Sequence, residues 1–123
     1  MPLQKKKPRP WRVLIVGTGT LLEEGVKSLL AHEADIRVSE IVYASESTFI
    51  QDVPGMNPDV IVFHETGPLN SGRIFELLKA IPEMGTLRVI ILRSSNATID
   101  FYEKRTLNAT RSQDFINLVR RYA

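Results

Sequence analysis

The chain has no cysteine, which excludes a disulfide framework and a thiolate metal site. No apolar run approaches the roughly 18 to 20 residues that a membrane-spanning helix needs. No hydrophobic segment precedes Trp11 that would serve as a secretory signal. With only two histidines in the chain, no Ser-His-Asp catalytic triad can be assembled from the sequence. These absences predict a cytoplasmic protein that does not bind a membrane.

What remains is the composition of an ordinary globular protein. The 123 residues are 43% hydrophobic and 24% charged, which fits one domain that buries roughly two-thirds of its unfolded surface. Proline and positive charge are concentrated at the start, so we expect a flexible basic arm over residues 1–10 and a folded domain over residues 11–123.

The arm sets the charge asymmetry of the chain. Five positive charges and no negative ones fall in the first twelve residues: Lys5, Lys6, Lys7, Arg9 and Arg12. The eleven basic and fourteen acidic residues that follow leave the remainder at −3. A solubilising tail accounts for such an arm, and weak nucleic-acid binding through counterion release is the alternative.

Strand and helix patterns alternate along the chain. Apolar, β-rich runs predict four strands, at 12–16, 36–43, 59–63 and 89–92. Between them, helical periodicity or capping signals predict helices that begin at Thr20, at Glu46 and at Gly72. Pro54 should end the second helix near Asp52. This order predicts a doubly wound α/β sheet.

Two helix starts carry further detail. Thr20 with Glu23 forms a capping box, followed by an apolar pattern at Leu22, Val26, Leu29 and Leu30. Thr110 with Gln113 predicts a second capping box. It opens a last helix with Phe115, Leu118, Val119 and Tyr122 at helical spacing.

The last strand should run the other way. Only six residues separate Leu92 from Ile99, whereas a parallel crossover needs a dozen or more. The β-forming segment 98–107 should therefore return antiparallel to the strand at 89–92, across a tight turn at 94–97.

The segment from Asp59 to Gly72 resembles the third strand and following loop of receiver domains, the phosphorylated switches of bacterial two-component signalling. In that family an Asp accepts the phosphoryl group, with Pro four positions later and Gly eight positions later. Here Pro68 and Gly72 hold those positions, but His64 stands where the acceptor would be.

Other family positions follow the same pattern of a retained scaffold and lost chemistry. Gly17 and Thr18 stand where receivers keep the acidic pair that holds Mg²⁺. Arg93 and Ser94 follow the fourth strand, where the family has its Thr or Ser, and Lys104 is a loose match to the family's Lys. The resemblance implies a three-layer, flavodoxin-like sheet of order 2-1-3-4-5 in which helix 4 is missing.

The chemistry at these positions argues against phosphotransfer. Aspartyl phosphorylation needs a carboxylate nucleophile and a Mg²⁺ held by hard oxygen ligands. Glu65 is the only acid beside the site, and it should point away from His64 because neighbouring strand residues alternate. We expect a structural role for His64, with phosphoryl acceptance or metal binding by His64 as the alternatives.

A different class of function rests on Gly17-Thr18-Gly19, directly after the first strand. The loop looks like the start of a dinucleotide-binding motif, but Leu22 stands where the third glycine belongs. A loop that holds an anion at a helix start is the simpler form of this alternative.

The resemblance and the missing carboxylates imply a non-phosphorylatable pseudo-receiver: a signalling or regulatory module that binds proteins, with no enzymatic activity and no cofactor. A small nucleotide- or anion-binding domain is the alternative. The resemblance implies that partners meet the C-terminal face, and the antiparallel edge strand is a template for a homodimer. The candidate interface residues are Phe101, Tyr102, Lys104 and Arg105.

Overall fold

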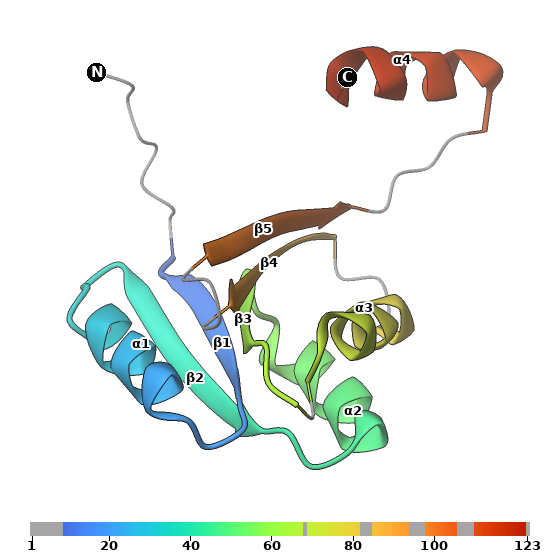
Figure 1. Cartoon of the computed structure of the whole chain (residues 1–123). Coiled ribbons are helices and arrows are strands. Elements are labelled where there is room, and N and C mark those ends of the chain that lie inside the picture. The colour runs from blue at the N-terminus through green and yellow to red at the C-terminus, as the bar shows by residue number, and fades with distance from the viewer. Residues whose placement is uncertain (1–8, 68, 82–84, 94–97, 106–109, 123) are drawn as a thin grey trace.

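The computed structural model describes residues 9–67, 69–81, 85–93, 98–105 and 110–122 (Figure 1). Strands and helices alternate through most of this part of the chain. In order, they are β1 (Trp11–Gly17), α1 (Leu21–Ala31), β2 (Ile36–Val42), α2 (Glu46–Met56), β3 (Val60–His64), α3 (Ser71–Ala80), β4 (Thr86–Arg93), β5 (Thr98–Arg105) and α4 (Ser112–Tyr122).

The five strands form one sheet of order β2-β1-β3-β4-β5. The β1–β2, β1–β3 and β3–β4 pairs are parallel, and β5 runs antiparallel to β4 with Leu92 opposite Ile99. The predictions of an α/β sheet, its strand order and its antiparallel last strand are confirmed. This order is that of doubly wound sheets of the flavodoxin type. In such sheets the topological switch point, where the strand order reverses, lies between β1 and β3.

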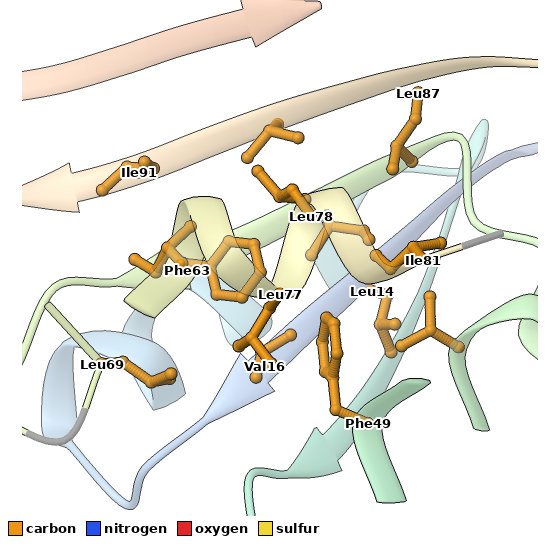
Figure 2. Close-up of a cluster of buried hydrophobic side chains, with 14 residues drawn as sticks. Leu14, Val16, Phe49, Phe63, Leu69, Leu77, Leu78, Ile81, Leu87 and Ile91 are labelled. Carbon is orange, nitrogen blue, oxygen red and sulfur yellow. The ribbon is translucent and has the colours of Figure 1, made fainter. Parts of the chain in front are cut away.

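Two apolar cores cover the two faces of the sheet. The larger core lies between the sheet and helices α2 and α3, and Phe49, Phe63 and Leu77 are among its fully buried members (Figure 2). The smaller core lies on the α1 side, where Val13 and Ile15 are buried against Val26 and Leu30 of α1 and their neighbours. The buried residues of the smaller core come from β1 and β3, with Leu92 from β4.

The predicted end of α2 at Asp52 is wrong. The helix continues through Pro54 to Met56 and ends at Asn57, which has a left-handed backbone with φ of 46°. Proline removes one backbone donor from the helix. Burial of Phe49 and Val53, at 2% and 0% exposure, outweighs that loss and keeps the last turn helical.

The capping box of Thr20 and Glu23 is confirmed at α1, with both halves formed. The capping box predicted for Thr110 and Gln113 is wrong. Helix α4 begins at Ser112, and the carboxylate of Asp114 accepts from the amides of Thr110 and Arg111. Asp114 accepts more strongly as an ion than Gln113 does as a neutral amide.

The apolar pattern of α1 is only half used. Val26 and Leu30 pack on the smaller core, whereas Leu22 and Leu29 are 40% and 69% exposed.

No helix in the described part of the chain is long and apolar enough to cross a membrane.

Most of the predicted basic arm, residues 1–8, lies outside the described residues, as does the turn predicted at 94–97. Arg9 is described, and its guanidinium donates to both carboxylate oxygens of Asp59 at 3.0 and 2.9 Å. The backbone amide of Arg12 donates to the same carboxylate at 2.8 Å. Asp59 thus links the chain just before β1 to the start of β3.

Candidate functional site

The candidate site lies where β1 and β3 end, at the edge of the sheet that binds ligands in doubly wound folds. β1 ends at Gly17, and β3, the neighbouring strand, ends at His64. The chain leaves β1 through Thr18 and Gly19, turns with a φ of +88° at Gly19, and enters α1. A positive φ favours glycine, because a Cβ would be strained there.

A buried carboxylate fills the loop between β1 and α1. Glu23 Oε1 accepts from the backbone amides of Thr18, Gly19 and Thr20 at 2.8, 3.0 and 3.2 Å. Its Oε2 accepts from the hydroxyl of Thr18 at 2.9 Å. Glu23 is only 2% exposed. The loop amides proposed to bind an anion therefore already hold the carboxylate of this chain's own Glu23.

Two opposing effects act on the ionisation of Glu23. Burial works to raise the pKa of this carboxyl group, because a charge is costly away from water. Hydrogen bonds from Thr18 and Thr20 outweigh burial and hold the pKa below its ordinary value. Glu23 is therefore a carboxylate at neutral pH.

His64 lies next to this carboxylate and is 6% exposed. Its Nδ1 is 2.9 Å from the hydroxyl oxygen of Thr20 and 3.6 Å from Glu23 Oε2. Its Nε2 has no hydrogen-bond partner among the described residues. The Thr20 hydroxyl also accepts from the Glu23 amide at 3.3 Å. Thr20, Glu23 and His64 form one buried polar cluster, called here the Glu23–His64 cluster.

A second polar cluster lies on the other side of the sheet. Arg93 Nη1 donates to both carboxylate oxygens of Glu65 at 3.0 and 2.9 Å, and its Nε donates to Asp100 at 2.5 Å. Ser71, at the start of α3, donates its hydroxyl proton to Glu65. Glu65 and His64 thus contact different partners, as the alternation along the strand predicted.

The structure separates residues that the receiver resemblance placed in one pocket. Arg93 belongs to the second cluster and does not approach His64 within hydrogen-bond distance. Lys104 is opposite Leu87 near the start of β4, whereas His64 is opposite Leu92. Five strand residues separate those positions, or about 16 Å. The assignment of Lys104 to the pocket is therefore wrong, because β5 runs antiparallel. Ser94 lies outside the described residues.

The four candidate interface residues divide between the two faces of β5. Tyr102 packs edge-on against Phe75 of α3, with ring centroids 5.2 Å apart. Lys104 Nζ donates to the carbonyl oxygen of Leu78 at 2.7 Å. Phe101 lies on the opposite face and is 58% exposed, and Arg105 donates to Glu103 at 2.5 Å.

Glu23 is the site residue that the sequence reasoning missed, and the expectation that Glu65 is the only acid beside the site is wrong. The signal was present: the capping box places the Glu23 side chain back over the first turn, next to the glycine loop. Capping boxes usually lie at the surface. Here the turn sits against the end of β3, so the same side chain is buried.

The described residues contain no group of three or more His, Asp or Glu side chains placed to hold a metal ion. No protein-family model, curated protein or solved structure matches the chain.

Proposed function

We propose that this chain is a receiver-like domain that takes no phosphoryl group and acts as a signalling or regulatory module by binding other proteins. The observation that carries this proposal is the Glu23–His64 cluster. It occupies the ends of β1 and β3, where the receiver family keeps its acidic pair and its phosphoacceptor. Strand order supports the comparison with that family, since receivers share the order 2-1-3-4-5.

The chemistry of the cluster favours a structural role. A phosphoacceptor must expose a nucleophile to a phosphodonor, whereas His64 is 6% exposed and Glu23 is 2% exposed. Within the described part of the chain, the hydrogen bonds to the Glu23 carboxylate come from the loop and helix start that it stabilises. A Mg²⁺ ion would need several such oxygens to be free.

The anion- or nucleotide-binding alternative meets a specific obstacle. The amides of Thr18, Gly19 and Thr20 already donate to Glu23. An external phosphate would have to displace that carboxylate from a buried position and move it into water. The receiver-like proposal needs no such rearrangement.

The test uses the full chain labelled with ¹⁵N, together with a phosphorylatable receiver as the positive control. Both proteins are titrated with Mg²⁺ and beryllofluoride, a phosphoryl mimic, and incubated with radiolabelled acetyl phosphate. We expect amide shifts and labelling in the control protein alone. Saturable shifts at Gly17, Gly19 and His64, or a stable phosphoadduct, contradict the proposal. Parallel titrations with ATP and NAD examine the alternative, which predicts shifts confined to residues 17–20.

A further inference from the structure

One face of β5 is packed and the other is bare. Tyr102 and Lys104 contact α3. Ile99 and Phe101 point to the other face, because side chains alternate along a strand. They are 66% and 58% exposed. Among the described residues, little covers β5 on the α1 side, whereas Leu92 of the neighbouring β4 is buried there at 9% exposure.

Helix α1 borders this uncovered region. Lys27 pairs with Glu40 of the edge strand β2, at 3.5 Å, so its flank of the helix faces that edge. Leu22 and Leu29 lie on the opposite flank at 3.6 residues per turn, which faces β3 and β4. Both leucines are exposed, although they are apolar. We call the region bounded by Leu22, Leu29, Ile99 and Phe101 the open face.

The floor of the open face is apolar as well. Val60 of β3 and Ile90 of β4 are partly buried members of the smaller core, and Ile90 lies directly opposite Phe101. Burial falls steadily from β1, where Ile15 is 1% exposed, to Phe101 on β5. This gradient is expected of a sheet that has one covering helix where its width needs two.

Helix α4 has the surface that would cover the open face. Phe115, Ile116 and Val119 are 63%, 41% and 51% exposed, and they lie along one side of the helix with Leu118. No side chain from Ser112 to Arg121 is buried. Figure 1 shows α4 apart from the sheet, beyond β5.

The length of α4 fits within that of β5, and its charge is opposite to that of the body of the chain. Eleven helical residues measure about 16 Å, less than the roughly 26 Å of the eight-residue strand β5. Three basic residues and one acidic residue give residues 111–123 a charge of +2. Nine basic and thirteen acidic residues give residues 11–110, the folded domain without its last segment, a charge of −4. The opposite net charges of the helix and the body favour contact between them.

We propose that α4 of one chain docks on the open face of a second copy, and that two copies exchange their helices reciprocally. The inference rests on the proposed function, because it names a second copy of the chain as the protein that is bound. The structure already presents α4 outward, where a neighbour can receive it. A two-fold exchange covers both apolar surfaces of both chains at once, with no new surface required.

The first test compares the mass of the full chain in solution with that of α4 variants. Size-exclusion chromatography with light scattering should give a dimer for the unmodified protein at about 100 µM. The double substitution Phe115→Asp with Val119→Asp should lower the dimer affinity by at least about 100-fold, and Asn117→Asp, on the opposite side of α4, should not change it. A monomeric unmodified protein, or a dimer indifferent to the double substitution, overturns the proposal. If the α4 variant misfolds by circular dichroism, Phe101→Asp on the open face takes its place.

The second test separates exchange from closure of α4 onto its own chain. Because the protein has no cysteine, a variant with Ile99→Cys and Val119→Cys contains only the two introduced thiols. Mild oxidation should produce a covalent dimer on a non-reducing gel. A covalent monomer, or no cross-link, overturns the exchange.

A mixing experiment then locates the cross-link. Equal amounts of the two single variants, Ile99→Cys and Val119→Cys, should yield the mixed covalent dimer in excess over either homodimer. A predominance of either covalent homodimer overturns the exchange, because a homodimer cross-link joins two open faces or two α4 helices and not an open face to α4.

The outcomes also separate this inference from the proposed function. A monomer that neither binds beryllofluoride nor labels from acetyl phosphate removes the exchange and leaves the receiver-like proposal intact. An exchanged dimer that takes a phosphoryl group removes the proposed function and leaves the interface intact.

Discussion

Glu23 and His64 lie side by side in the protein interior, with 3.6 Å between Glu23 Oε2 and His64 Nδ1 and no more than 7% of either side chain exposed. Thr20 joins them, since its hydroxyl contacts the imidazole and the Glu23 amide. The side chains of Glu23 and His64 therefore fill the space at the ends of β1 and β3. A substitution at either residue should therefore change the stability of the fold.

Replacing Glu23 should destabilise the protein and remove part of its acid sensitivity. The pKa of Glu23 is held below its ordinary value by hydrogen bonds that outweigh burial. Between the unfolded value, about 4.3, and the lower folded value, the unfolded chain binds more protons. The stabilisation is therefore fully present above about pH 5 and is lost as the pH falls through the folded pKa.

Thermal melts from pH 7 to pH 3 measure this effect in Glu23→Gln and in the unmodified protein. An amide cannot accept all of the carboxylate's hydrogen bonds, so we expect a loss of about 1 to 3 kcal/mol at pH 7 and a shallower acid slope. The matched control is Glu24→Gln, since the Glu24 side chain is 62% exposed. An equal loss in both variants contradicts the prediction.

Introducing an acid at the end of β3 should reverse the sign of the pH effect. In His64→Asp the introduced carboxyl is buried beside Glu23, so burial and the like charge both raise its pKa. With its folded pKa above the unfolded value, the variant loses stability as the pH rises between the two values, by about 1.4 kcal/mol for each pH unit.

We therefore expect His64→Asp to melt higher at pH 5 than at pH 7, measured by circular dichroism. His64→Asn controls for the lost ring and should show no such rise on acidification. A His64→Asp protein that is equally stable at both values would place the introduced group in water.

Two glycines near α1 should respond to alanine in opposite directions. A Cβ at Gly19 or at Gly25 meets nothing within 4 Å, so the backbone alone decides the outcome. Gly19 has a φ of +88°, which costs a non-glycine residue about 1 to 2 kcal/mol. Gly25 lies inside α1, where alanine gains about 0.8 to 1 kcal/mol. Urea unfolding of both variants measures the difference, and the same sign in both contradicts it.

Removing the basic arm should change the melting temperature only slightly. Deletion of residues 1–10 removes the Arg9–Asp59 pair, whose side chains are 41% and 13% exposed. A pair with one partner at the surface contributes little, and Asp59 keeps its bond from the Arg12 amide. We expect a fall of less than about 4 °C by calorimetry. The control is deletion of residues 1–8, which keeps Arg9. A fall in melting temperature of more than about 4 °C in that control would mean that the arm packs on the body.

If the arm binds nucleic acid, retention of the full chain on a DNA column should fall steeply with salt, because phosphate contacts release counterions. Deletion of residues 1–10 should abolish retention. Salt-independent retention, or retention of the truncated chain, assigns binding to another surface.

Local signals in the sequence determined several features of this protein by themselves. Loop length forced the antiparallel β5, since six residues between Leu92 and Ile99 cannot span a crossover. The capping box of Thr20 and Glu23 set the start of α1. Both features depend on residues close together in the chain, so their geometry can be worked out from spacing alone.

Tertiary structure decided the rest. His64 is 41 positions from Glu23 and meets it only because β3 lies beside β1. Lys104 is carried away from the same site because β5 reverses direction. Burial of Phe49 and Val53 extends α2 past Pro54. Each outcome depends on which distant segments pack together, a free energy that belongs to the assembled sheet and its two cores and that no local spacing contains.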